Sequence, residues 1–217
     1  MKPYYQHAGI TIYHGDCREI LPGLPKVNAV VTDPPYGINA ARKRNSQKWR
    51  WRDYDVNGWD AERPPAELLR LVVGAGRRAV IWGGNYFTDA LPFVPRGKWL
   101  VWDKAQTDFS LADCEMAWCS WEGPIRRLLY SRGAANNRED KQHQTQKPEE
   151  VMLWSIRQLE GGSDNRLLLD PFMGSGTTLR AAKNAGREAI GIEIEERYCE
   201  IAAKRLQQEV LPLEQAI

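Results

Sequence analysis

The chain has 217 residues, 42% of them hydrophobic, which suffices for one well-buried α/β domain or one domain with a sizeable excursion. Because 30 Lys and Arg balance 28 Asp and Glu, net charge indicates no class of partner, and any nucleic-acid surface must be local. No apolar run is long enough to cross a bilayer, and the first residues lack the apolar region of a signal peptide, so we expect no contact with a membrane.

Apolar runs of strand type alternate with helical patterns along the chain. The strand-like runs lie at residues 9–16, 28–33, 78–84, 98–104, 114–121, 166–170 and 188–194. The helical patterns lie at residues 64–76, 148–160, 177–186 and 195–209. Strands that alternate with helices predict a mostly parallel sheet with helices on both faces.

Two features depart from this alternation. The apolar runs 114–121 and 124–130 are separated by a short turn, and this spacing predicts that they pair as an antiparallel hairpin. Residues 39–63 and 131–146 are too long and polar to be ordinary connections, so we interpret both segments as functional or mobile loops.

Carboxylates occur where four of the predicted strands end. These residues are Asp16, Asp33, Asp170 and Glu193. If the four strands are parallel neighbours, their carboxylates lie at one edge of the sheet, which is where doubly wound folds bind their ligands. The sequence therefore predicts a binding site at this edge.

The third of these acids opens a glycine-rich loop with the sequence DPFMGSGTT. Gly174 and Gly176 allow close approach to a ligand, and Thr177 and Thr178 can cap the following helix. No lysine follows the glycines, so the loop is not a Walker A motif. Glu193 ends the next strand, from which an acid can bind ribose hydroxyls. This combination indicates a nucleoside without pyrophosphate, and S-adenosylmethionine fits that description.

Four motifs occur in a fixed order along the chain: DPPYG at residues 33–37, HQTQKP at 143–148, DPFMGSGTT at 170–178 and GIEI at 191–194. Together they resemble the amino-methyltransferases of DNA, which modify adenine N6 or cytosine N4, in the permuted subgroup with DPPY before the cofactor loop. The resemblance implies a Rossmann-like methyltransferase fold: a single domain of residues 1–217 whose mostly parallel sheet carries an antiparallel hairpin. It implies no metal.

The resemblance gives the DPPY segment, Asp33, Pro34, Pro35 and Tyr36, the catalytic role. An exocyclic base amine is a poor nucleophile because its lone pair is delocalised into the ring. Asp33 can accept one N–H and the carbonyl of Pro34 the other, which draws the lone pair out of conjugation. The prolines add no competing N–H and fix the geometry, while Tyr36 offers a face for a flipped base.

The resemblance also implies the residues that bind the cofactor. Asp16 would bind the adenine amino group, Phe172 the adenine ring and Glu193 the ribose. His143, Thr145 and Lys147 lie in the segment that lines the methionine end in relatives, although a histidine in a loop is often only solvated. The full set comprises Asp16, Cys17, Asp33, His143, Thr145, Lys147, Asp170, Pro171, Phe172, Gly174, Ser175, Gly176, Thr177 and Glu193.

The long segment 39–63 contains a basic stretch with interleaved tryptophans. Its members are Arg42, Lys43, Arg44, Lys48, Trp49, Arg50, Trp51 and Arg52. Basic side chains pair with phosphates and indoles stack on bases, so we expect this stretch to bind double-stranded DNA. Residues 121–144 form a short candidate target-recognition segment. Lys104 and Glu115 either border the target pocket or form a surface pair.

An aspartate at the first position of DPPY favours methylation of adenine N6. Cytosine-N4 methylation, the same chemistry on adenine in RNA, and a non-catalytic nucleic-acid-binding module are the alternatives. The resemblance also allows a homodimer. Cys17, Cys114, Cys119 and Cys199 form no CxxC pair, which fits the reducing cytoplasm and argues against a disulfide framework.

Overall fold

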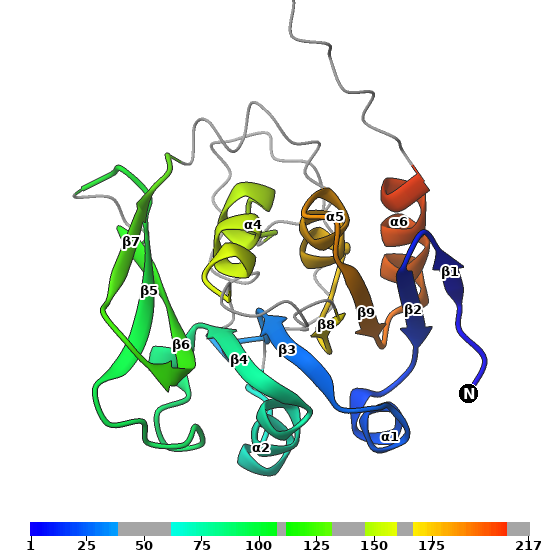
Figure 1. Cartoon of the computed structure of the whole chain (residues 1–217), viewed down its shortest axis with the longest axis horizontal. Helices are drawn as coiled ribbons and strands as arrows, with labels where there is room; N and C mark the ends of the chain where they lie inside the picture. Colours follow the sequence, from blue (N-terminus) through cyan, green and yellow to red (C-terminus); the bar gives the residue numbers. More distant parts are fainter. Residues whose placement is uncertain (39–61, 108–111, 132–145, 160–166, 208–217) are drawn as a thin grey trace, which may run out of the picture.

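The computed structural model describes residues 1–38, 62–107, 112–131, 146–159 and 167–207. A nine-stranded sheet runs through these residues (Figure 1). Its strands are β1 (Tyr5–His7), β2 (Ile10–His14), β3 (Val27–Thr32), β4 (Gly76–Trp82), β5 (Gly97–Asp103), β6 (Cys114–Glu122), β7 (Arg126–Leu129), β8 (Leu167–Asp170) and β9 (Glu188–Glu193). Across the sheet they follow the order β1-β2-β9-β8-β3-β4-β6-β5-β7.

Five neighbouring strands, β2, β9, β8, β3 and β4, are mutually parallel. Their carboxyl ends therefore meet at one edge of the sheet. Strands β8 and β9 end on Asp170 and Glu193, Asp33 follows β3 directly, and Asp16 lies two residues beyond β2. The predicted alignment of four carboxylates is confirmed, and we call this side of the sheet the acidic edge.

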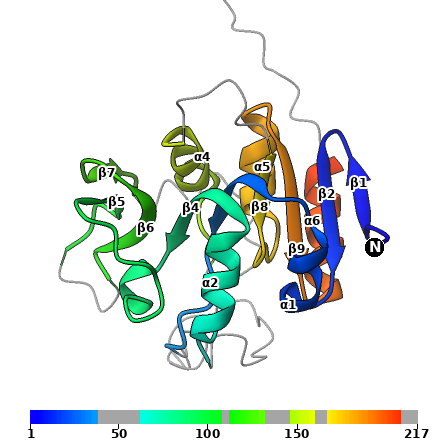
Figure 2. The same ribbon diagram turned by 60° about the horizontal axis from the view of Figure 1, so that its bottom comes forward.

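Helices cover both faces of the sheet (Figures 1 and 2). One face carries α4 (Glu149–Arg157), α5 (Thr177–Asn184) and α6 (Glu196–Gln207). The opposite face carries α1 (Cys17–Ile20), α2 (Ala66–Gly74) and the short 3₁₀ helices η1 (Leu21–Gly23) and η3 (Gly84–Tyr86). The chain is thus a three-layer α/β structure, as the alternation of patterns predicts.

The central strands are apolar on both faces because both faces are covered. In β3, Ala29 and Val31 pack toward α4 and α5, whereas Val30 packs toward α1 and α2. In β4, Val80 packs toward α4 and α5, whereas Ile81 packs toward α1 and α2. Successive residues of a strand point to opposite faces, so an unbroken apolar run fills two cores at once. This packing holds the strand ends, and hence the acidic edge, in fixed positions.

The predicted pairing of runs 114–121 and 124–130 is wrong. Strand β6 pairs antiparallel with β5, and its other edge pairs antiparallel with β4. Strand β7 instead pairs parallel with β5. Since both edges of β6 are already occupied, β7 pairs instead with the outer edge of the neighbouring β5.

The predicted capping of α5 by threonine is also wrong. Gly176, with a φ of 80°, is the residue before the helix, and no side chain caps the first turn. The hydroxyl of Thr178 instead hydrogen-bonds the carboxylate of Asp170. Burial of that carboxylate explains the difference, because a buried acid without hydrogen-bond donors is costly.

Two further observations concern the described residues. None of the helices among them is both long and apolar enough to cross a membrane. All four cysteines fall within the described ranges, and none of them is in a disulfide. The prediction of free thiols is therefore confirmed.

Candidate active site

The loop after β3 brings Tyr36 back onto Asp33. The Tyr36 hydroxyl donates a hydrogen bond of 2.5 Å to Oδ1 of Asp33. The ring of Tyr36 stacks on that of Tyr86, with centroids 5.0 Å apart and planes inclined by 18°. Pro34 and Pro35 fix φ between these two functional side chains, so the loop has little freedom to separate them.

Gly83 allows Tyr36 to occupy this position. It follows β4 with a φ of 68°, a conformation that side chains rarely adopt. A Cβ atom there would lie 2.1 Å from Cε1 of Tyr36. The backbone at the end of β4 therefore lies directly against the tyrosine ring, and only glycine allows this approach.

Lys147 is buried beside Asp33. Its Nζ atom lies 2.8 Å from Oδ2 of Asp33, 2.8 Å from Oε2 of Glu115 and 2.9 Å from the hydroxyl of Tyr36. Glu115, on β6, also pairs with the buried Lys104 at 2.7 Å. The resemblance placed Lys147 at the methionine end of the cofactor, whereas the structure places its ammonium against the carboxylate of DPPY.

Burial and charge act in opposite directions on these groups. Burial raises the pKa of Asp33 above its ordinary value, and Glu115 adds to this, while Lys147 acts in the opposite direction. Burial also acts to raise the pKa of Glu115, but Lys147 and Lys104 outweigh it and lower that pKa to about 2. Burial acts to lower the pKa of Lys147, but Asp33 and Glu115 outweigh it, so this pKa is raised above its ordinary value. Glu115 and Lys147 are therefore ionised at neutral pH.

Asp170 lies under the glycine loop, nearly fully buried at 3% exposure. Its Oδ1 accepts hydrogen bonds from the Thr32 hydroxyl at 2.6 Å and from the Phe172 N–H at 3.1 Å. Burial raises the pKa of Asp170 to about 6, against the lowering effect of these bonds and of the one from Thr178. Asp170 thus ties the end of β3 to the start of the glycine loop.

Glu193 orders the opposite side of the glycine loop. Its Oε2 accepts from the N–H of Gly174 at 2.9 Å, and its Oε1 accepts from the N–H of Glu195 at 2.9 Å. Burial raises the pKa of Glu193. Gly174 has a φ of 50°, and a Cβ atom there would meet no heavy atom within 4 Å. The backbone of the loop therefore borders open space at Gly174.

Arg205 supports the same loop and was missed by the sequence reasoning. From α6, its Nη1 lies 2.7 Å from the carbonyl oxygen of Ser175, 3.2 Å from the Ser175 hydroxyl and 3.4 Å from the Thr177 hydroxyl. The only sequence signal was an arginine on the apolar face of a helix. Gly176 also lies against α6, where a Cβ atom would be 2.7 Å from Cβ of Ala202.

Asp16 has a structural role in this state. It caps α1 by accepting from the N–H of Arg18 at 2.8 Å, and its carboxylate pairs with the Arg18 guanidinium. These bonds lower the pKa of Asp16. The neighbouring Cys17 is buried, and its surroundings raise the pKa of its thiol to about 11. Cys17 is accordingly a packing residue rather than a reactive thiolate at neutral pH.

The remaining predicted residues of the glycine loop lie beside Asp170. Pro171 is buried, and the partly buried Phe172 packs against the apolar cluster under α1 and α2. The Ser175 hydroxyl lies 3.2 Å from Oε1 of Gln146, which directly precedes Lys147. The start of the α4 segment therefore contacts both the glycine loop and the catalytic loop.

Several predicted residues lie outside the described ranges. They are His143 and Thr145 of the cofactor set, and the basic stretch of residues 42–52. The described residues on either side of segment 39–61 are close together. Gly37, with a φ of 73°, lies so near Arg63 that a Cβ atom at Gly37 would be 2.9 Å from the Arg63 nitrogen. Arg63 therefore lies beside Gly37 of the catalytic loop.

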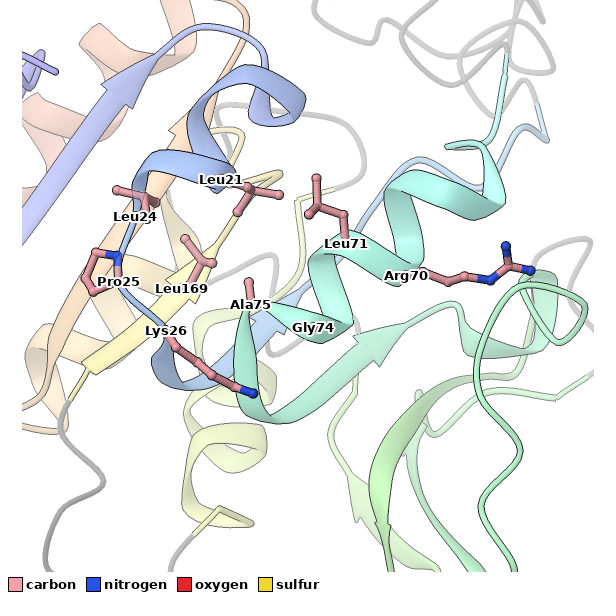
Figure 3. A pocket seen from close by; sticks show the side chains of 9 residues that line it. All are labelled: Leu21, Leu24, Pro25, Lys26, Arg70, Leu71, Gly74, Ala75 and Leu169. Carbon is pink, nitrogen blue, oxygen red and sulfur yellow. The ribbon is translucent and has the colours of Figure 1, made fainter.

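A separate pocket of about 360 Å³ is lined by other residues (Figure 3). It is located between η1 and α2, at the amino ends of β3 and β4, and is therefore opposite the acidic edge. Its lining includes Leu21, Leu24, Leu71 and Leu169 together with Lys26 and Arg70. It contains none of the predicted site residues.

Comparison with known proteins relates the chain to methyltransferases. The type II methyltransferase M.HinfI of Haemophilus influenzae is 28% identical over 91% of this chain and 68% of its own. The crystal structure of the M1.HpyAVI–SAM complex aligns with a TM-score of 0.57 and 28% identity, covering 90% of this chain and 99% of that one. The PvuII DNA methyltransferase, which is cytosine-N4-specific, aligns with a TM-score of 0.63 over 97% of this chain and 90% of that one, but at 18% identity this likeness concerns the fold alone.

A family model described as DNA methylase, of the N6/N4 methyltransferases, matches residues 82–204, more than half of the chain. The match includes Lys147, the glycine loop and Glu193, although it begins after the DPPY segment. The alignments with M.HinfI and M1.HpyAVI and the geometry at the acidic edge agree with this match. The chain belongs to the N6/N4 DNA methylase family.

Proposed function

We propose that this DNA amino-methyltransferase uses S-adenosylmethionine to methylate the N6 amino group of adenine in double-stranded DNA, after the base has flipped out of the helix. Family membership carries the broader activity. The observation that supports the reaction in this chain is the position of the Asp33 carboxylate. It lies beside Tyr36 at the acidic edge, and β3, which precedes it, neighbours β8, which leads into the glycine loop.

The residues at the acidic edge fit S-adenosylmethionine. Asp16 and Glu193 offer carboxylates to a ligand with ribose hydroxyls, an adenine amino group and a positive charge, while the buried Asp170 holds the glycine loop beside them. The backbone at Gly174, where an added Cβ atom would meet no heavy atom within 4 Å, is open to approach by such a ligand. We assign Glu193 to the ribose, Asp16 to the adenine amino group and Phe172 to the adenine ring. When bound, this cofactor supplies an electrophilic methyl group.

Asp33 activates the target amine in this proposal. Its carboxylate accepts one amine N–H while the carbonyl of Pro34 accepts the other, and this frees the nitrogen lone pair for attack. A carboxylate has about four acceptor positions, so Asp33 can bind the amine while it keeps its partners Tyr36 and Lys147. The remaining requirement is alignment of nitrogen, methyl carbon and sulfur, which is a matter of positioning.

Tyr36 and Tyr86 provide the aromatic surface for the flipped base. Tyr86 is 39% exposed and stacks on Tyr36, so the pair extends from the buried carboxylate toward the solvent. A base that has left the duplex loses its stacking energy, which aromatic side chains can replace. We infer that the base is held at this pair with its amino group toward Asp33.

The DNA duplex would lie over the acidic edge, against segment 39–63. The residues that flank this segment, Gly37 and Arg63, lie against each other next to the catalytic loop, and this supports the proposal. Six Lys and Arg residues between positions 42 and 52 can neutralise phosphates, and two tryptophans can stack on bases. We further propose that residues 121–144 contribute to target recognition.

Other features of the proposal concern the whole chain. We propose that residues 1–217 form one methyltransferase domain of the permuted subgroup, because DPPY precedes the glycine loop. We also propose a cytoplasmic protein that can form a homodimer. The free cysteines agree with a reducing compartment.

Mass spectrometry of nucleosides tests the proposal. Unmethylated double-stranded DNA is incubated with the protein and S-adenosylmethionine, digested and compared with a reaction that lacks the cofactor. We expect N6-methyladenine. N4-methylcytosine alone would overturn the choice of base, and methylated adenine only in an RNA substrate would overturn the choice of nucleic acid. No methylation of either would instead indicate a non-catalytic nucleic-acid-binding module.

A further inference from the structure

Two acids and two lysines alternate in a series of ion pairs next to the catalytic loop. The series consists of Asp33 with Lys147 at 2.8 Å, Lys147 with Glu115 at 2.8 Å and Glu115 with Lys104 at 2.7 Å. The lysine side chains are only 5% and 7% exposed, and those of the acids 25% and 24%. The four charges sum to zero, as a buried cluster requires.

The ammonium of Lys147 has no donor left for a further ligand. An ammonium carries three N–H donors. Asp33, Glu115 and the Tyr36 hydroxyl accept these three, at distances between 2.8 and 2.9 Å. A cofactor carboxylate could reach Lys147 only by displacing one of these three partners, so the contacts favour a different role.

We propose that Lys147, anchored by Glu115, is a positioning residue that holds the Asp33 carboxylate where it can accept the target amine. This inference rests on the proposed function and adds a role to it. The bond from Lys147 fixes Oδ2 of Asp33, and the bond from Tyr36 fixes Oδ1. With both oxygens held, the carboxylate cannot rotate away from the acidic edge.

The chain around Lys147 is itself fixed on both sides. Gln146 contacts Ser175 of the glycine loop at 3.2 Å, and α4 begins at Glu149 directly after Pro148. Lys147 therefore connects the cofactor loop to the catalytic carboxylate. A displacement of the glycine loop would be transmitted to Asp33 through two adjacent residues.

The proposal predicts how substitutions shift the pH dependence. The groups that face Asp33 are Lys147 before α4, Glu115 on β6, Tyr36 of its own loop and Asp170 on β8. Lys147 favours the ionised form of Asp33 and Glu115 opposes it. Lys147→Gln should therefore move the acidic limb of kcat/KM to higher pH, and Glu115→Gln should move it to lower pH.

The experiment measures kcat/KM for DNA methylation against pH, together with the Kd for S-adenosylmethionine by calorimetry. For Lys147→Gln we expect an upward shift of the acidic limb by about one pH unit and at least about a tenfold lower kcat at neutral pH, with Kd changed by less than about threefold. Lys147→Arg, which keeps the charge, should restore the wild-type limb. Lys98→Gln is the matched control, because Lys98 is equally buried but contacts Gln158 and Trp121.

The outcomes separate the alternatives. An unshifted limb in Lys147→Gln would overturn the positioning role, and a Kd weakened by more than about tenfold with an unshifted limb would make Lys147 a cofactor ligand. If Lys147→Gln does not fold, the opposite shift in Glu115→Gln decides the question, and its absence overturns the role. A wild-type protein that transfers no methyl group would overturn the proposed function itself. This result differs from an active wild-type protein whose Lys147→Gln variant shows no shift, which would overturn only the role of Lys147.

Discussion

The hydroxyl of Thr32 donates a hydrogen bond of 2.6 Å to Oδ1 of Asp170, across the boundary between β3 and β8. Thr32 immediately precedes the catalytic aspartate of the proposed mechanism, and Asp170 opens the glycine loop. This single buried bond therefore couples the position of the nucleobase site to that of the cofactor site. The same bond holds the carboxylate of Asp170 in a buried position, where burial disfavours its charged form.

Asp170 should lower the stability of the protein at neutral pH. Its pKa of about 6 in the fold exceeds the ordinary value of 3.8, so the folded state binds more protons between pH 4 and 6. The contribution of Asp170 is favourable below about pH 4 and is lost as the pH rises through about 6. Asp170→Asn should raise the free energy of unfolding at pH 8 by on the order of 1–3 kcal/mol, and by less at pH 5.

Urea denaturation at the two pH values checks this expectation. Asp103→Asn serves as the control, because Asp103 ends β5 at a more exposed position. A loss of stability in Asp170→Asn at pH 8 would contradict the argument.

Asp33→Ala should abolish methyl transfer while leaving the cofactor bound. Removal of a preorganised acceptor at the reacting nitrogen should lower kcat by at least about 10²–10³-fold. The Kd for S-adenosylmethionine should change by less than about threefold, because the glycine loop keeps its contacts with Asp170 and Glu193. Radiolabelled methyl transfer and calorimetry measure the two quantities, with Asp103→Ala as the control. Substantial activity in Asp33→Ala would refute the role of this carboxylate.

Gly83→Ala should displace Tyr36. The new Cβ atom would lie 2.1 Å from Cε1 of the ring, so the ring must move away from its contact with Asp33. A shift of about 1 Å at a reacting site can cost up to about 100-fold, and we expect kcat to fall by about 10–100-fold.

Gly186→Ala is the matched control for this variant. Gly186 has a φ of 66°, close to the 68° of Gly83, but a Cβ atom there would meet no heavy atom within 4 Å. Both variants bear a similar backbone strain of about 1–2 kcal/mol. Both variants should therefore lose thermal stability to a similar extent, but only Gly83→Ala should also lose activity. Equal activities in the two variants would argue against the displacement of Tyr36.

Arg205→Gln should weaken cofactor binding. The guanidinium holds the carbonyl and hydroxyl of Ser175, so its loss frees the glycine loop. A hydrogen bond from a charged group contributes about 1.5–3 kcal/mol, which corresponds to at least about a tenfold weaker Kd for S-adenosylmethionine. Lys204→Gln is the neighbouring control, since Lys204 is exposed and pairs with Glu200. A Kd equal to that of the control would remove Arg205 from the support of the loop.

Replacement of Arg42, Lys43 and Arg44 by Ala should weaken DNA binding and reduce its salt dependence. Each phosphate contact contributes about −0.9 to the slope of log K against log salt, so four contacts give about −3.6. Loss of three contacts should flatten the slope by about 2.7. Fluorescence anisotropy with labelled duplex at several salt concentrations measures the slope.

A triple variant with the same change in charge provides the control. Lys26, Arg70 and Arg77 are exposed and lie at the amino ends of β3 and β4, opposite the acidic edge. Their replacement by Ala should leave the slope nearly unchanged. Equal slopes in both triple variants would locate the DNA elsewhere.

The fold and the acidic edge could be predicted from the sequence because both depend on local patterns. Apolar runs give the strands, and the residue that ends each parallel strand necessarily lies at the same edge as its neighbours. Asp33, Asp170 and Glu193 therefore share one edge whatever the details of packing. The polar segments 39–63 and 131–146 interrupt the apolar pattern, and this interruption makes them recognisable in the sequence.

Contacts between distant residues could not be predicted in this way. The ion pairs of Lys147 with Asp33 and Glu115 join three elements that are far apart in sequence, and no spacing encodes them. The support from Arg205 depends on how α6 lies against the glycine loop. The place of β7 depended on which strand edge was still free, which local sequence does not specify.

The order of the strands has a consequence for biosynthesis. Strands β9 and β8, from the last quarter of the described chain, lie between β2 and β3 from its beginning. A ribosome must therefore deliver nearly the whole polypeptide before β2 and β3 can enter a common sheet, and folding of such high contact order is intrinsically slow. Until then the nascent chain has neither the acidic edge nor a closed core, and its uncovered apolar strands are candidates for capture by chaperones.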